Sequence, residues 1–388
     1  MRPLEGITVL TLEHAIAAPF CTRQLADLGA RVIKVERPGV GDFARAYDSR
    51  ARGLSSHFVW TNRSKESLTL DVKHPEAKSI LAALVGKSDV IVQNLAPGAA
   101  ARLGISEAAL RPAHPGLILC DISGYGGDGP YRDRKAYDLL IQSEAGFLSV
   151  TGTPEDGVKA GISIADIAAG MYAFTGILAA LYERQNTGLG HHLDISMLEA
   201  MAEWMSFPMY YAMDGNSPPP RAGAAHATIF PYGPFRAGDG RAVMFGLQNE
   251  REWALFCDKA LAMPGLATDP RFDANAKRVA ARAELTEIIQ AAFTELDAEA
   301  VVSRLDAAGI GNAQVRDMAE LWAHPQLAAR DRWREVGSPA GPLPALLPPA
   351  GGDRMDPVPA LGANTDAILA ELGYDTDAIA GMPEAGAV

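Results

Sequence analysis

The chain has 388 residues, which suggests two domains, and 48% of its residues are hydrophobic and 21% charged, as expected of a globular protein. Its formal net charge of −12 argues against nucleic-acid binding, and the N-terminal apolar run is too short and too polar for a signal peptide or membrane span. Because the three cysteines lie far apart without metal-type spacing, we expect a cytoplasmic protein that binds no metal.

The first half of the chain alternates short apolar runs with longer amphipathic ones. This alternation predicts an α/β fold in which a parallel sheet has helices on both faces. The strands are expected at residues 7–12, 32–35, 90–93, 117–122 and 192–195. The helices are expected at residues 19–28, 76–84, 137–148, 167–181 and 197–205.

Composition changes at residues 214–221, where three prolines and a Gly-Asn pair are incompatible with regular structure. Beyond this point a hairpin around the turn at 238–240, followed by helices, predicts a smaller α+β unit. The predicted organisation is a large domain over 1–205, a linker over 206–224, a small domain over 225–330, and an extended return with a C-terminal helix over 331–388.

Asp166 lies where an apolar segment passes into the long apolar-periodic run at 167–181. This position predicts a helix N-cap. A carboxylate there is stabilised by the helix dipole and by unpaired backbone N–H groups, so we expect it to stay ionised and fixed in direction. Capping is enough to explain an aspartate at this position, and a catalytic role remains open at this point.

Basic residues follow successive elements of the predicted sheet, at the edge where open α/β sheets bind ligands. They are Arg37, Lys73 and Arg102, and together they predict a polyphosphate pocket within an acidic protein. The turn after the first strand lacks the glycines of a dinucleotide-binding fingerprint, so an NAD enzyme is not expected. The glycine-rich segment 124–130 lacks the Lys-Ser/Thr ending of a Walker motif and is interpreted as a tight loop.

The segment from Leu12 to Arg102, the helix after Asp166 with residues 176–181, and the late pair Leu361-Gly362 together resemble the family III CoA-transferases, also called the CaiB/BaiF family. The resemblance covers nearly the whole chain. It implies a Rossmann-like large domain built from both chain ends, a small α+β domain between them, and two subunits interlocked as a homodimer. It also implies that coenzyme A binds as a substrate and that no cofactor is held permanently.

By the same resemblance, Asp166 matches the catalytic aspartate of the family. The residues that fall on its coenzyme A contacts are Ala15, Ile16, Ala17, Arg37, Leu70, Lys73, Asn94, Leu95, Arg102 and Tyr125. Their chemistry agrees, since the three cations can neutralise phosphates and the apolar and aromatic groups can flank adenine or the pantetheine arm. The mechanism implied is nucleophilic attack by Asp166 on an acyl-CoA thioester, through aspartyl-anhydride and aspartyl-CoA thioester intermediates.

The sequence departs from the family pattern at two places. Some members carry a run of four glycines that closes over the intermediate, and the matching segment here is 223–229. A glutamine beside the active site of some members corresponds to Ile16, so that oxyanion contact is either missing or supplied by another group. His226 is a candidate for that replacement polar group.

Two other functions compete with CoA transfer. The 2-methylacyl-CoA racemases of the same superfamily use a histidine and a glutamate that are replaced here by Tyr137 and Asn249, and tyrosine is a poor base near neutral pH. These replacements favour transfer. A non-catalytic, dimeric CoA-binding protein is the third interpretation, in which Asp166 is only a cap.

Residues 230–235 and 246–253 look similar to a branch that handles C4 and C5 dicarboxylates such as succinate, mesaconate, itaconate or citramalate. The expected partners are therefore an acyl-CoA such as succinyl-CoA and a small carboxylic acid, without nucleic acid or membrane. Tyr137, His226 and Asn249 are the candidate substrate residues. Transfer between the two carboxyl groups of one dicarboxylate remains an alternative.

Overall fold

The computed structural model describes residues 2–349, 351 and 353–388. The described chain forms two compact units: Met1–Ala145, Ala160–Met205 and Gln326–Val388 make the first, and Gly146–Lys159 with Ser206–Pro325 make the second. Residues 146–159 were expected in the first domain. They belong to the second unit because the backbone of Gly152 accepts the N–H of Gly223 at 2.7 Å and Arg221 donates to the carbonyl of Pro154 at 2.7 Å.

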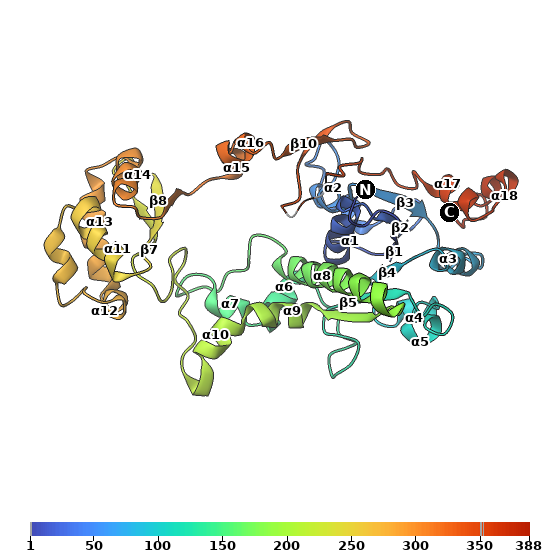
Figure 1. Ribbon diagram of the computed structural model, residues 1–388, viewed down its shortest axis with the longest axis horizontal. Helices are drawn as coiled ribbons and strands as arrows, with labels where there is room; N and C mark the ends of the chain where they lie inside the picture. Colours follow the sequence, from blue (N-terminus) through green and yellow to red (C-terminus); the bar gives the residue numbers. More distant parts are fainter. Residues whose placement is uncertain (1, 350, 352) are drawn as a thin grey trace. The chain divides into compact units, whose positions relative to one another are not determined.

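The first unit contains a six-stranded sheet in which every neighbouring pair of strands is parallel (Figure 1). The strands are β1 (Thr8–Leu12), β2 (Arg31–Glu36), β3 (Lys65–Thr69), β4 (Val90–Gln93), β5 (Ile118–Ser123) and β6 (His192–Ser196). Their spatial order is β3-β2-β1-β4-β5-β6, the order of a doubly wound dinucleotide-type sheet. The predicted α/β class with a parallel sheet is confirmed.

Helices and a few short elements accompany the sheet in the first unit. They are α1 (Ala17–Asp27), η1 (Phe43–Ala46), α2 (Ser56–Asn62), α3 (Ala77–Val85), α4 (Ala99–Arg102), α5 (Glu107–Leu110), α6 (Asp138–Glu144), α8 (Ile164–Thr187), α9 (Met197–Trp204), β10 (Trp333–Val336), β11 (Leu343–Leu346), α17 (Thr365–Glu371) and α18 (Thr376–Gly381). α16 (Pro325–Ala329) lies where the chain returns to this unit.

Alternate residues of the central strands face opposite sides of the sheet, and each side has its own helices. Leu10 and Leu12 of β1 share a buried cluster with Ile80 and Leu84 of α3 and with Ile368 of α17. The opposite face is covered by α1, which contacts β2 and β4, and by α8, which contacts β5 and β6. Both faces are therefore buried, which explains the nearly continuous apolar strands.

α8 is the longest helix, drawn in green in Figure 1, and it lies directly against α1. Among the described residues it alone is long and apolar enough to cross a membrane by length and composition, yet its buried face packs on α1 and the sheet. Small residues make this packing close. A Cβ placed on Gly170 would lie 2.7 Å from the carbonyl oxygen of Ala17.

Two features of the first half differ from the prediction. β3 was not predicted, because Lys65-Glu66-Ser67-Leu68-Thr69 has one large aliphatic residue and owes its burial to polar contacts. The helix expected at 137–148 is broken, because Gly146 has a left-handed φ of 73° between α6 and α7 (Phe147–Val150).

The chain returns from the second unit to cover the open edge of β3. Asn364 exchanges backbone and side-chain hydrogen bonds with Ser67, at 3.0 Å each. The hydroxyl of Thr365 accepts the N–H of Thr69 at 3.0 Å. These contacts satisfy groups that an unpaired edge strand would leave open.

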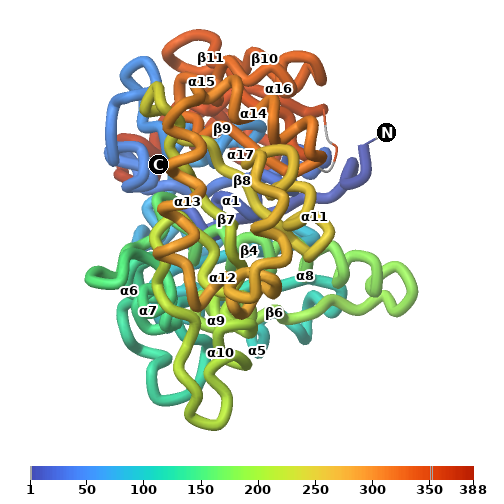
Figure 2. Tube along the Cα trace, turned by 90° about the vertical axis from the view of Figure 1, so that its left-hand side faces the viewer, coloured from blue at the N-terminus to red at the C-terminus, as the bar shows by residue number. Residues whose placement is uncertain are grey.

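The second unit is built on a three-stranded antiparallel sheet (Figure 2). Its elements are α7, α10 (Ser206–Tyr211), η2 (Met213–Gly215), β7 (Tyr232–Arg236), β8 (Ala242–Gly246), α11 (Glu250–Leu255), η3 (Phe256–Ala260), η4 (Pro264–Thr268), α12 (Asn275–Ala280), α13 (Arg282–Thr294), α14 (Ala298–Ala307), β9 (Asn312–Gln314) and α15 (Met318–Trp322). The predicted hairpin is β7–β8. The expected linker at 206–224 instead starts with a helix, α10.

Gly170→Ala is predicted to destabilise the protein, because the added methyl group meets the carbonyl of Ala17 and forces α8 away from α1. Overpacking of this kind costs about 1–3 kcal/mol, measured as a lower urea midpoint. Gly381→Ala in α18 is the matched control, since a Cβ there meets nothing within 4 Å. Equal stability of both variants would show that the two helices separate without cost.

Candidate active site

Asp166 lies in the first turn of α8, three positions after the N-cap residue Ser163. The predicted N-cap role is wrong, because the helix already begins at Ile164. The backbone N–H of Ala17, the first residue of α1, stabilises the anionic form of this half-buried carboxyl. The N-terminal ends of two helices therefore meet at this side chain.

Asp138, the first residue of α6, supplies the cap that Asp166 was expected to provide. One of its carboxylate oxygens accepts the N–H of Ala165 at 2.8 Å and that of Asp166 at 3.4 Å. The other oxygen accepts the side-chain amide of Gln142 at 2.6 Å. A second carboxylate therefore occupies the start of α8, next to Asp166.

Burial is the main reason that the pKa of Asp166 is raised, the charge of Asp138 adds to it, and the backbone N–H of Ala17 offsets the two only in part, so that the pKa lies at about 7. The expectation that the helix start keeps this group ionised is therefore corrected: removal from water outweighs the helix dipole. Near neutral pH the protonated and anionic forms are both populated. A buried carboxyl with such a pKa is characteristic of reactive sites.

Ala15, Ile16 and Ala17 form the turn from β1 into α1. Ala15 has a left-handed φ of 60°, and its N–H donates to Asp42 at 3.2 Å. Asn94 holds the preceding residue, His14, accepting its N–H at 2.8 Å and donating to its carbonyl at 2.9 Å. The side chain of Ile16 is buried, so the backbone N–H of Ala17 is the polar group that this turn presents to Asp166.

A cavity of about 540 Å³ opens beside this turn. It is lined by Leu12, His14, Val35, Glu36, Arg37, Pro38, Leu70, Asp71, Val72, Lys73, Leu95 and Gly386. Apart from Gly386, which follows α18, these residues lie at the carboxyl ends of β1 to β4, on both sides of the point where the strand order reverses between β1 and β4. An open α/β sheet binds its ligands at this place.

Four of the predicted coenzyme A contacts line this cavity, namely Arg37, Leu70, Lys73 and Leu95. Two are cations and two are aliphatic, a combination that suits phosphates and an adjoining apolar group. The carboxylate of Glu36, which also lines the cavity, is already bound by Arg45 and Ser67 at 2.6–2.8 Å. The two cations therefore remain available to an anion.

The other predicted contacts lie outside this cavity. Asn94 holds the turn as described, and Arg102 is the last residue of α4. Tyr125 packs edge-on against Tyr131, with ring centroids 5.4 Å apart. Tyr137 precedes α6 with 67% of its surface exposed, adjacent in sequence to the capping Asp138.

His226 and Asn249, the two candidate substrate residues of the second unit, have structural partners there. The Nδ1 atom of His226 accepts the N–H groups of Thr228 and Ile229 at 3.2 and 3.1 Å, and its ring stacks on Tyr232. Asn249 is the N-cap of α11, and its side chain accepts the N–H of Glu252 at 3.0 Å. These contacts shape a loop and a helix start.

Sequence reasoning missed three residues that the structure brings to the site: His14, Tyr47 and Asp138. His14 lines the cavity, and its buried Nδ1 atom has no hydrogen-bond partner among the described residues. The pKa of Tyr47 is raised to about 12 by burial and by the negative charges of Asp42 and Asp166. The only sequence signal was the position of His14 directly after a predicted strand.

The described residues contain no group of three or more His, Cys, Asp or Glu side chains arranged to hold a metal ion. Cys21, Cys120 and Cys257 are buried and free.

CoA-transferase family III matches residues 4–365 of the chain. The chain belongs to this family. Human succinyl-CoA:glutarate CoA-transferase is 33% identical over 100% of this chain and 90% of its own length. Acetyl-CoA:oxalate CoA-transferase of Acetobacter aceti is 35% identical over 85% of each chain.

A crystal structure of a CAIB/BAIF family protein from Brucella suis superposes on this family III chain with a TM-score of 0.83 and 31% identity, over 96% of this chain and 99% of that one. The family resemblance seen in the sequence is therefore confirmed. The chain is an enzyme of the CoA-transferase class, and its substrates include CoA thioesters.

Asp138→Asn is predicted to shift the acid limb of the pH–rate profile to lower pH. A nucleophilic Asp166 would have to be anionic, so activity that depends on it would fall as the pH drops through the pKa of this group, about 7. Removing the neighbouring charge lowers that pKa, by about one unit for a close carboxylate, while the amide oxygen still caps Ala165.

The profile is measured as kcat/KM against pH, which reports ionisations of the free enzyme. Glu144→Gln at the exposed end of the same helix is the control and leaves the acid limb in place. An acid limb shared by wild type and Asp138→Asn would mean that Asp138 has no electrostatic influence on the group that titrates.

Proposed function

We propose that this enzyme transfers coenzyme A from an acyl-CoA such as succinyl-CoA to a small dicarboxylic acid, with Asp166 as the nucleophile. The observation that carries the proposal is a carboxyl with a raised pKa that is influenced by the Ala17 N–H of the β1–α1 turn, while His14 of the same turn lines a cavity with Arg37 and Lys73. The cations suit the phosphates of coenzyme A, and the apolar wall suits its uncharged parts.

In the first half-reaction the Asp166 carboxylate attacks the thioester carbonyl, and the C–S bond breaks to release CoA thiolate and leave an acyl-aspartyl anhydride. The thiolate then attacks the aspartyl carbonyl. The donor acid leaves as its carboxylate, and an aspartyl-CoA thioester remains. The backbone N–H of Ala17 is placed to stabilise the oxyanions formed on the way.

In the second half-reaction the acceptor carboxylate attacks the aspartyl thioester and releases the thiolate again. The thiolate attacks the acceptor carbonyl of the new anhydride, which forms the product thioester and restores the Asp166 carboxylate. Burial favours both halves, because the site excludes water that would hydrolyse the intermediates.

Two relatives support a dicarboxylate acceptor. The names of the human and Acetobacter aceti enzymes give different acyl donors, succinyl-CoA and acetyl-CoA, but both give a dicarboxylic acid as acceptor. The two relatives thus share the chemical class of the acceptor acid, although their acyl donors differ. Within the C4–C5 range expected from the sequence, glutarate, mesaconate, itaconate and citramalate are the acids to test.

The racemase alternative requires a general base that exchanges a proton at carbon 2 of the acyl group. Tyr137, which stands at the racemase histidine position, is exposed and is a weak base near neutral pH. Incubation of a (2R)-methylacyl-CoA in deuterated water without free acid separates the two activities. Solvent deuterium at carbon 2, with inversion, would establish racemisation.

CoA transfer is tested by offering succinyl-CoA with each acid of the panel, and with acetate as the monocarboxylate control, while mass spectrometry records the CoA esters. Glutaryl-CoA or another dicarboxyl-CoA is expected as product. Asp166→Asn is expected to lower kcat by about three orders of magnitude or more. If none of the acids yields a CoA ester, the transferase proposal fails and only a CoA-binding role is left.

The covalent intermediate is tested by quenching the enzyme with hydroxylamine after incubation with succinyl-CoA and mapping the modified peptide. Modification is expected at Asp166, and not in Asp166→Asn. An active enzyme that is never modified would transfer coenzyme A without this intermediate. A dicarboxyl mono-CoA labelled in one carboxyl group shows whether the transfer also runs within one molecule.

We further propose a homodimer, because the short helix α10 exposes Phe207, Met209 and Tyr210, each with more than half of its surface accessible. Apolar side chains gathered in this way mark a surface that another protein covers. Sedimentation is expected to give twice the monomer mass, and Met209→Lys with Tyr210→Lys to weaken the association. A monomeric wild type would exclude the dimer.

A further inference from the structure

Four buried charges lie beneath α1, on the opposite side of the sheet from α3. They are Glu13, Lys34, Asp42 and Lys65, and their side chains are fully inaccessible to solvent. Glu13 accepts from Lys65 at 2.6 Å and from Lys34 at 3.3 Å, and Lys34 also donates to Asp42 at 2.8 Å. The cluster contains equal numbers of positive and negative charges, as burial demands.

The two lysines hold Glu13 in its ionised form. Burial alone would raise the pKa of Glu13, but Lys65 and Lys34 reverse this and lower it to about 2. The hydroxyls of Thr11 and Thr22 donate to the same carboxylate at 2.8 and 2.6 Å. Removing such ions from water costs free energy, and hydrophobic residues of similar volume would often stabilise the fold to the same degree.

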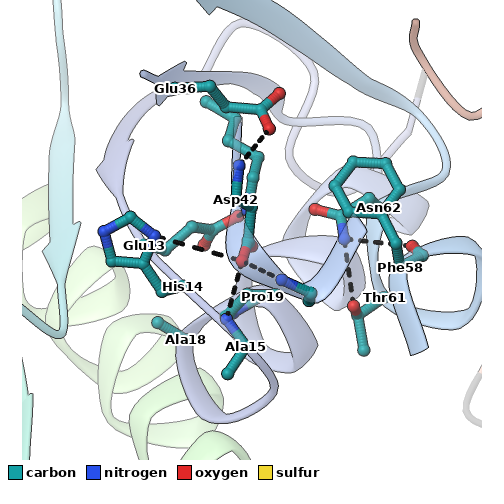
Figure 3. A network of polar contacts seen from close by, with 12 residues as sticks. Glu13, His14, Ala15, Ala18, Pro19, Glu36, Asp42, Phe58, Thr61 and Asn62 are labelled. Carbon is teal, nitrogen blue, oxygen red and sulfur yellow. Dashed lines mark hydrogen bonds and ion pairs between the residues drawn. The ribbon is translucent and has the colours of Figure 1, made fainter. Parts of the chain in front are cut away.

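Asp42 connects this cluster to the turn at the active site. One carboxylate oxygen accepts from Lys34, and the other accepts the backbone N–H groups of Ala15 at 3.2 Å and Ala44 at 2.9 Å. Its own N–H donates to Glu36 at 3.0 Å. Figure 3 shows Asp42 between Glu36 and Ala15, with its carboxylate directed at the turn.

The turn needs such a contact, because Ala15 adopts a left-handed φ of 60°. This conformation costs a non-glycine residue roughly 1 kcal/mol or more unless the surroundings hold it. Two residues further, Ala17 donates its N–H to the carboxyl of Asp166. The direction of that N–H therefore depends on the backbone that Asp42 and Asn94 hold in place.

We propose that Asp42, fixed by the buried Lys34, is a positioning residue that holds the Ala15 peptide in its left-handed conformation and thereby aims the Ala17 N–H at Asp166. The inference rests on the proposed attack by Asp166. A misdirected N–H would leave coenzyme A binding at Arg37 and Lys73 unchanged and slow the acyl transfer itself.

The test uses the full-length double variant Lys34→Met/Asp42→Leu. It removes one positive and one negative charge, leaves the Glu13–Lys65 pair intact and deprives Ala15 of its acceptor. We expect kcat for succinyl-CoA-dependent transfer to fall about tenfold to a hundredfold, with KM for succinyl-CoA changed less than about threefold. Hydroxylamine trapping of Asp166 should slow by the same factor as kcat.

Ala15→Gly distinguishes positioning from a general loss of stability. Glycine adopts a positive φ without steric cost. Adding Ala15→Gly to the double variant should therefore reduce its decrease in log kcat by at least about a third. Absence of rescue would overturn the role assigned to the Ala15 conformation.

Asp27→Asn is the matched control, since Asp27 is an equally buried carboxylate at the far end of α1 that binds Arg23 and Arg63 at 2.7 Å. It should lower stability without lowering kcat. Amide hydrogen exchange, followed by mass spectrometry without substrate, should be faster over residues 13–18 in Lys34→Met/Asp42→Leu and unchanged there in Asp27→Asn.

If the double variant does not fold, the single variant Asp42→Ala replaces it, because it removes the acceptor of the Ala15 N–H while Lys34 keeps its ion pair with Glu13. Wild-type kcat in a folded Asp42 variant, with trapping of Asp166 intact, would overturn the positioning role alone. A wild-type enzyme that neither transfers coenzyme A nor is trapped at Asp166 would instead overturn the proposed function.

Discussion

The close packing of α8 against α1 is the constraint on which the site depends. Because position 170 is glycine, the first turn of α8 lies against the first turn of α1, and the N–H of Ala17 reaches the carboxyl of Asp166. The same contact removes that carboxyl from water. One packing arrangement thus supplies both the hydrogen-bond donor and the desolvation, and neither would persist if the helices moved apart.

Opposing effects act on Asp166, and their balance suits a nucleophile. Two helix starts and the Ala17 N–H favour the anion, whereas burial and Asp138 disfavour it and prevail, so that the pKa lies at about 7. The carboxylate loses charge as it attacks. The destabilisation of the anion is therefore smaller in the transition state than in the ground state, which lowers the barrier. A solvent-exposed cap aspartate would have no comparable gain.

Periodicity predicted the parts of the fold that bury apolar faces: the parallel strands, α8 and the β7–β8 hairpin. It missed β3, whose lysine and serine are buried by ion pairs and hydrogen bonds with residues distant in sequence. The same limit applies to the start of α8, which was misplaced because its cap, Asp138, comes from another helix, a tertiary contact that local patterns do not show.

The segment that covers the edge of β3, with Gly362, Asn364 and Thr365, is made after the whole second unit. During synthesis the first six strands therefore leave the ribosome with the β3 edge uncovered and with the α17 side of their core open. This nascent sheet is a natural client for chaperones. The order of synthesis, and not only the sequence of each unit, thus determines how long the active-site half of the enzyme is at risk of aggregation.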